Sequence, residues 1–167
     1  MPDESLGVLA KATPCNPVVG DYRKHPQHCT FLRLGLSSNM LDDHLKRLSR
    51  AYPLWLDDDY RFVIVEEIKL PPGYNCRATQ LLIQLPPDYP VSPPGVGDNR
   101  VYVASGLRFR GRTLRDVHDS IPPSFETPGS GPWAWFCYEW IHWDPLRDSL
   151  IRFVEMIKAN LTNPPTD

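Results

Sequence analysis

The sequence lacks any apolar run near the roughly 20 residues that a membrane-spanning helix needs. Its first residues, MPDESLGVLAKATP, have neither a basic start nor a long apolar core, so we expect no signal peptide. It also lacks an excess of positive charge, because the formal net charge is −2. Such a balance gives no general attraction to nucleic acid or to anionic membranes. We therefore expect a cytoplasmic protein without a membrane or nucleic-acid partner.

Cysteine is also scarce, with four residues in 167 and no Cys-x-x-Cys pair. This usage favours a reduced, intracellular chain over a disulfide framework. Cys15, His25, His28 and Cys29 lie near one another, but their spacing fits no common zinc pattern. We expect no metal and no cofactor.

Proline, in contrast, is abundant, with 19 residues that indicate rigid turns and strands that stop abruptly. The length indicates one domain. Residues 1–36 show weak periodicity and several breakers, so we interpret them as an N-terminal extension and residues 37–167 as the folded domain.

Hydrophobic periodicity predicts an α+β domain with an N-terminal helix, a short antiparallel sheet, an irregular stretch that bears Cys137, and a C-terminal helix. Leu41, Leu45 and Leu48 form one apolar stripe of the first helix, residues 38–51. Strands are predicted over residues 62–70, 78–85 and 100–104, followed by a loop over residues 105–132. Asp144 and Pro145 are typical of a helix start, as N-cap and first helical residue.

Two groups of basic residues are candidate contact surfaces. Lys46, Arg47 and Arg50 lie in the last turns of the first predicted helix, where they form either a solvated face or a docking surface for an acidic partner. A second group within the 105–132 segment predicts a solvated hairpin or a contact for an acidic partner; its members are Arg108, Arg110, Arg112 and Arg115.

Cys137 lies in an aromatic stretch, residues 133–145, that holds four of the five tryptophans. Large aromatic residues bury much area and fix their neighbours. The cysteine is therefore either a packed core residue or a nucleophile on a rigid support. Upstream, Tyr89-Pro90-Val91-Ser92-Pro93-Pro94 forms a stiff loop in which the bond before Pro90 is a candidate cis peptide.

These motifs resemble those of the ubiquitin-conjugating enzymes, and most closely their bacterial relatives. Leu85-Pro86 and Tyr89 to Pro94 are similar to the family motif F-P-x-x-Y-P-x-x-P-P. Cys137 followed by Trp143-Asp144-Pro145 is similar to the family's catalytic cysteine followed by W-x-P and a long helix. The resemblance covers residues 38–163.

The sequence departs from the family pattern at several points. It has no His-Pro-Asn tripeptide before the cysteine, so the role of the asparagine is either unfilled or filled by another group, such as His118 or His142. The interval from Pro94 to Cys137 is longer than is usual, and Cys137 to Trp143 is slightly short. The strand region after the first helix is abbreviated.

The resemblance implies a ubiquitin-like protein transferase. Cys137 would accept a ubiquitin-like protein from an activating enzyme as a thioester and pass it to an amine of a protein target. His142 and Asp144 are the nearest supporting groups in sequence, although both residue types also suit packing or capping. Lys46, Arg47, Arg50, Tyr89 and Pro90 would contact partner proteins. The bacterial relatives are encoded in antiphage defence operons.

Two other functions remain open. The absence of His-Pro-Asn is consistent with an inactive fold that only binds a ubiquitin-like protein or scaffolds a complex. A cysteine hydrolase built from Cys137, His142 and Asp144 is the second alternative, but three groups so close in sequence rarely reach the geometry of a triad.

Overall fold

The computed structural model describes residues 36–98, 100–121, 132–138 and 142–167, with side chains from residue 40 onward. These residues form two helices and two antiparallel sheets, so the predicted α+β class is confirmed. The elements are α1 (Leu36–Ala51), β1 (Leu54–Leu56), β2 (Phe62–Lys69), β3 (Ala78–Gln84), β4 (Val101–Ala104), β5 (Arg108–Phe109), β6 (Arg112–Thr113), β7 (Val117–His118), β8 (Trp133–Phe136) and α2 (Leu150–Thr162). Neither helix combines the length and apolarity that crossing a bilayer would require.

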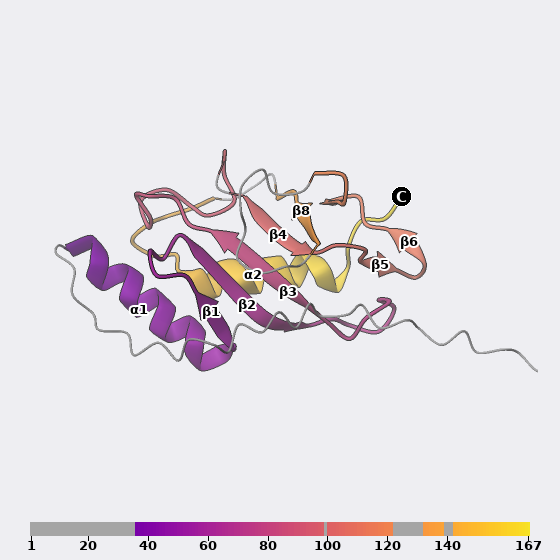
Figure 1. Cartoon of the computed structure of the whole chain (residues 1–167), viewed down its shortest axis with the longest axis horizontal. Coiled ribbons are helices and arrows are strands. Elements are labelled where there is room, and N and C mark those ends of the chain that lie inside the picture. Colours follow the sequence, from indigo (N-terminus) through magenta and orange to yellow (C-terminus); the bar gives the residue numbers. More distant parts are fainter. Residues whose placement is uncertain (1–35, 99, 122–131, 139–141) are drawn as a thin grey trace, which may run out of the picture.

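The main sheet has six strands in the order β1-β2-β3-β4-β8-β7, and every neighbouring pair is antiparallel (Figure 1). The strand β8 lies between β4 and β7, because the chain leaves the sheet after β4 and returns to pair with that strand. Strands β5 and β6 form a separate hairpin.

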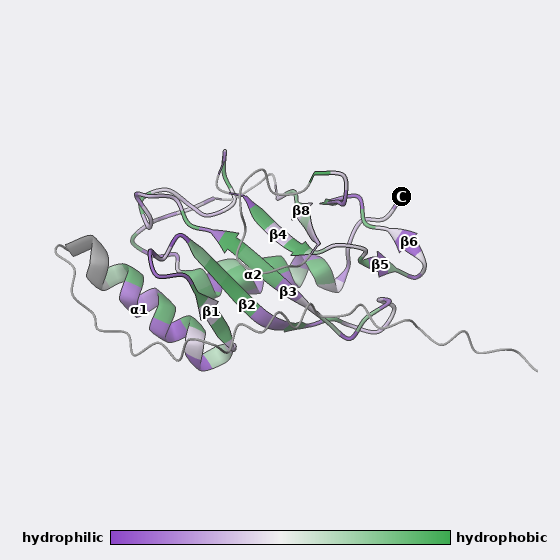
Figure 2. Cartoon of the chain, in the orientation of Figure 1, coloured by the Kyte–Doolittle hydropathy of each residue, from purple (hydrophilic) through white to green (hydrophobic). Residues whose placement is uncertain are grey.

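Both helices pack on one face of this sheet, and in Figure 1 α2 lies behind β2 and β3. Alternate strand residues point to this face, because successive side chains of a strand point in opposite directions. Val63, Leu81 and Val103 therefore join the helix-side core with Leu48 of α1 and Phe153 of α2. Figure 2 shows this apolar character along β2, β3 and α2.

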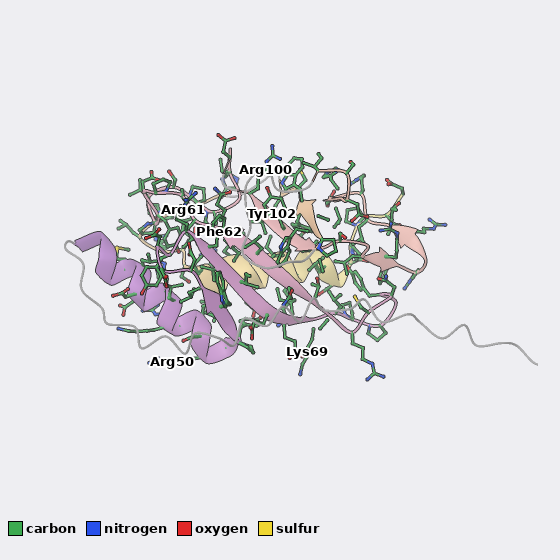
Figure 3. All side chains as sticks on the ribbon, viewed as in Figure 1. Arg50, Arg61, Phe62, Lys69, Arg100 and Tyr102 are labelled. Carbon is green, nitrogen blue, oxygen red and sulfur yellow. The ribbon has the colours of Figure 1, made fainter. Side chains whose placement is uncertain are left out.

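The other face of the sheet carries a second, aromatic cluster. Its buried members include Phe62, Tyr102 and Trp133, from β2, β4 and β8. The guanidinium of Arg61 lies 5.5 Å from the ring centre of Phe62, and that of Arg100 lies 4.9 Å from the ring centre of Trp135. Figure 3 shows Arg61, Phe62, Arg100 and Tyr102 near one end of the sheet.

Several predicted elements are confirmed and others are wrong. Helix α1 and strands β2, β3 and β4 match the predictions to within two residues. The segment 105–132 is not simply a loop, since the described part of it forms β5, β6 and β7, and the stretch before Cys137 is strand β8 rather than irregular. The hairpin predicted for the arginine-rich segment is confirmed as β5–β6.

The predicted start of the C-terminal helix is also wrong. Helix α2 begins at Leu150, and residues 145–147 form a turn before it. Asp144 stabilises this turn by accepting a hydrogen bond from the backbone N–H of Leu146 at 3.0 Å. The predicted N-cap therefore caps a turn instead of the helix.

The predicted extension, residues 1–36, lies almost wholly outside the described residues, as do Cys15, His25, His28 and Cys29. Within the described residues, no group of three or more His, Cys, Asp or Glu side chains could hold a metal ion.

Candidate functional site

Cys137 directly follows β8 and is half-buried. It is a thiol and not half of a disulfide. Its backbone N–H donates to the carbonyl oxygen of Asp116 at 2.8 Å, which continues the β7–β8 pairing by one residue. The thiol is therefore fixed at the end of a strand, with Asp116 on the neighbouring segment.

The sheet register places Cys137 at the same end as the proline loop, residues 86–94. Trp135 pairs with Tyr102 and Val101 pairs with Ile83, so β8 ends where β3 ends and β4 begins. The proline loop leaves the sheet at the end of β3. Its Tyr89–Pro90 bond is cis, as the sequence suggested.

Trp143, six residues after Cys137 in the sequence, contacts the proline loop. Its indole Nε1–H donates to the carbonyl oxygen of Pro90 at 2.7 Å, and its ring lies 5.9 Å from the ring of Tyr89 between centres. The two motifs that sequence analysis selected, 53 residues apart, are thus in direct contact.

Tyr89 is buried behind this contact and connects both helices. Its hydroxyl oxygen lies 2.6 Å from Nδ1 of His44, a buried residue of α1. Burial raises the pKa of Tyr89, while a hydrogen bond from the backbone of Leu150, the first residue of α2, opposes this rise. The Tyr89 O–H donates to Nδ1 of His44 when the imidazole proton is on Nε2.

His44 is held in its neutral form. Burial is the largest cause of its lowered pKa, the nearby Arg47 guanidinium lowers the pKa further, and Asp43 opposes both effects. Of the two neutral forms, the one with its proton on Nε2 leaves Nδ1 free to accept from the Tyr89 hydroxyl.

The turn between Trp143 and α2 is fixed by two carboxylates. The backbone N–H of Asp144 donates to Oδ2 of the buried Asp148 at 2.7 Å, and the N–H of Asp148 returns a bond to the carbonyl of Asp144 at 2.7 Å. Arg152 of α2 pairs with Asp148 at 2.7 Å. The chain directly after Trp143 is therefore held in a closed turn.

The other predicted site residues are dispersed. His142 is exposed immediately before Trp143, and the Asp144 carboxylate bonds Leu146 and pairs with Arg147 at 3.5 Å. Lys46, Arg47 and Arg50 are exposed on α1. His118 lies on β7, where its ring is centred 5.0 Å from that of Trp135.

Sequence reasoning missed His44, Asp116 and Asp148. His44 had a detectable signal, because it shares a helical face with Leu41 and Leu48 at spacings of three and four residues. Asp148 had a weaker signal, its i,i+4 spacing to Arg152. Asp116 had none, since its position opposite Cys137 depends on the pairing of β7 with β8.

Comparisons of the chain with protein-family models, with curated proteins and with solved structures gave no match.

Proposed function

We propose that the protein is a conjugating enzyme for a ubiquitin-like protein, with Cys137 as the residue that carries the thioester. The observation that carries this proposal is the contact between Trp143 and Pro90. It joins the two motifs on which the resemblance to ubiquitin-conjugating enzymes rests. Trp143 follows the half-buried Cys137 by six residues in the sequence.

In the first step, Cys137 Sγ attacks the thioester carbonyl of a ubiquitin-like protein held by an activating enzyme. A carbon–sulfur bond to Cys137 forms, the bond to the activating enzyme's cysteine breaks, and that cysteine leaves as a thiolate. Because one thioester replaces another, the reaction is nearly balanced and positioning contributes most of the catalysis. A cysteine thiol is nucleophilic enough to need no dedicated base.

In the second step, an amine of the target attacks the same carbonyl, the new carbon–nitrogen bond replaces the carbon–sulfur bond, and Cys137 leaves as a thiolate. The amine must also lose a proton. Asp116 is an additional candidate acceptor, because it lies opposite Cys137 in the continuation of the β7–β8 pairing, and opposite residues of such a pair carry their side chains on the same face of the sheet. Its carboxylate also pairs with Arg115 at 3.8 Å. We propose Asp116 for this step beside His142 and Asp144.

The partners would be a ubiquitin-like protein, its activating enzyme and a protein target. The exposed basic residues of α1, Lys46, Arg47 and Arg50, would contact the activating enzyme. The pathway would be cytoplasmic and would serve bacterial antiphage defence, as the resemblance implies.

The test is to mix the protein with the activating enzyme, the ubiquitin-like protein and ATP, and to run a non-reducing gel. We expect an adduct that thiol reagents remove, that is lost with Cys137→Ala, and that becomes a stable oxygen ester with Cys137→Ser. Cys76→Ala is the matched control, since Cys76 is also a half-buried thiol. A full adduct with Cys137→Ala would refute the role of Cys137 as the thioester residue. Binding of the ubiquitin-like protein without an adduct would support the scaffold alternative.

A further inference from the structure

A groove lies between the β5–β6 hairpin and the chain that follows α2. It has a volume of about 470 Å³, and we call it the hairpin groove; it is lined by Phe109, Arg110, Arg112, Asn163, Pro164 and Thr166. This volume falls within the roughly 300–1,000 Å³ range of small-molecule pockets. In Figure 1 the hairpin lies beside the C-terminal end, at the end of the molecule away from α1.

Backbone hydrogen bonds fix both walls of the hairpin groove. On one side, the N–H of Arg110 donates to the carbonyl of Gly73 at 2.7 Å, which anchors the hairpin turn. On the other side, the N–H of Arg115 donates to Pro165 at 3.0 Å and that of Asp167 donates to Thr113 at 3.3 Å. The groove is therefore preformed, so a ligand would bind without ordering its walls.

The hairpin turn itself projects an arginine in an uncommon conformation. Phe109 pairs with Arg112, so Arg110 and Gly111 form a two-residue turn, and both have positive φ, 52° and 78°. Asn or Gly is usual at the first position of such a turn. The Arg110 guanidinium lies 5.1 Å from the ring centre of Phe109, which holds it at the groove wall.

The charges of the four arginines in this region differ in how they are compensated. Arg108 pairs with Asp119 at 3.1 Å and Arg115 with Asp116 at 3.8 Å. Arg110 and Arg112 have no carboxylate partner within the described part of the chain. Among the described residues that line the groove, Arg110 and Arg112 carry the charge and none is an aspartate or glutamate. The Asp167 carboxylate is close by, with Oδ2 3.4 Å from the Thr113 hydroxyl.

The remaining lining residues add hydrogen-bond donors and an apolar surface. Asn163 contributes an amide and Thr166 a hydroxyl, while Pro164 and the part of Phe109 that Arg110 and Tyr74 leave uncovered provide an apolar wall. Guanidinium groups bind phosphate through paired N–H donors, and an apolar wall suits a ring or hydrocarbon part. The acidic net charge of the chain opposes a long polyanion such as nucleic acid.

We propose that the hairpin groove binds a small organic phosphomonoester, with the phosphate between Arg110 and Arg112 and the organic part against Phe109 and Pro164. This site is independent of the function proposed for Cys137.

The test is a calorimetric titration of the full chain with phenyl phosphate, together with phenol, inorganic phosphate and benzoate. We expect saturable binding of phenyl phosphate, at least roughly tenfold tighter than each of the other three, because only phenyl phosphate has both the dianion and the ring. Equal affinity for inorganic phosphate would mean an adventitious ion only, and equal affinity for benzoate would mean a carboxylate site; either result overturns the proposal.

Variants locate the binding. Arg112→Gln should weaken phenyl phosphate binding roughly tenfold or more, and Arg112→Lys should weaken it less, because lysine keeps the charge but loses the paired donors. Arg115→Gln is the matched control, since Arg115 lies three residues away and pairs with Asp116 outside the groove. Unchanged affinity in both Arg112 variants, or an equal loss with Arg115→Gln, would overturn the proposal.

Discussion

Tyr89 contacts more separate parts of the molecule than its position in a loop would suggest. Its hydroxyl contacts His44 of α1 and the start of α2, and its ring lies against Trp143. A buried hydroxyl that both donates and accepts is costly to remove, because its partners stay buried without a hydrogen bond. We therefore expect this one oxygen atom to stabilise the arrangement around Cys137.

Tyr89→Phe removes only that oxygen. We expect a loss of about 1–3 kcal/mol in the free energy of unfolding, because His44 Nδ1 and the Leu150 N–H lose their partner. Urea denaturation measures the loss. A double-mutant cycle with His44→Leu isolates the His44 contact, and we expect positive coupling; strictly additive effects of the two changes would contradict the hydrogen bond.

His44 makes stability depend on pH in a defined direction. Burial lowers its pKa in the folded protein from the ordinary value of 6.5, so the unfolded chain binds the proton more readily. The contribution of His44 is therefore complete above about pH 6.5 and is lost as the pH falls below it. We expect His44→Gln to flatten the decrease in the free energy of unfolding between pH 7 and pH 5. Parallel curves for the two proteins would refute this assignment.

At this scale the sequence predicted the residues with local motifs and missed those defined by distant contacts. Tyr89, Pro90 and Trp143 belong to recognisable short motifs. His44 lies 45 residues from Tyr89, and no local pattern indicates that a histidine on an apolar helix face meets a tyrosine. Asp116 depends on the register of two strands separated by residues 119–132.

In the turn before α2, tertiary contacts override a local signal for the start of a helix. Asp144-Pro145 matches the start signal of a helix, yet α2 begins at Leu150. Asp148 accepts from the Asp144 N–H and returns its own N–H to the Asp144 carbonyl, so the two residues close a turn. Leu146 is exposed, 87% of its surface being accessible, so a helix through it would gain no packing.

This arrangement makes Asp148 more important than Asp144, contrary to the sequence-based prediction. Asp148→Ala removes a buried carboxylate that bonds Asp144 N–H and pairs with Arg152, so we expect a loss of about 1–3 kcal/mol. Asp144→Ala loses a bond to Leu146 and an exposed ion pair, and we expect about 1 kcal/mol or less. Thermal denaturation of both variants measures these losses in the free energy of unfolding. Equal losses, or a larger loss with Asp144→Ala, would contradict the role assigned to Asp148 in the turn.

Strand prediction succeeded where an apolar, β-branched run is long enough to recognise. Strands β2 and β3 have eight and seven residues, and their apolar, β-branched content indicated them clearly. Strands β5, β6 and β7 have two residues each, too few for any period. Strand β8 has four residues, Trp133 to Phe136, and none of them is β-branched, so this signal was missing.

At the scale of the whole molecule, two groups of exposed basic residues lie on different elements. Arg47 and Arg50 lie on α1, whose His44 contacts Tyr89 of the proline loop. Lys69 and Arg77 lie at the end of the β2–β3 pair away from the proline loop, since Phe62 and Gln84 mark the end nearest that loop. Figure 3 shows Arg50 and Lys69 at different positions along the lower edge of the molecule.

This separation allows a charge-matched test of the docking surface in the proposed function. Arg47→Glu with Arg50→Glu should slow transfer from the activating enzyme about tenfold or more at low salt, because an exposed charge surface steers association. Lys69→Glu with Arg77→Glu changes the net charge by the same amount but alters the β2–β3 pair and not the surface of α1, so we expect little effect. Added salt should reduce the difference between the two variants, because salt screens exposed charges. Equal slowing by both pairs of substitutions would mean that net charge, and not a docking surface, causes the effect. An unchanged rate with the α1 pair would show that α1 is not the docking surface, but it would not contradict thioester formation at Cys137.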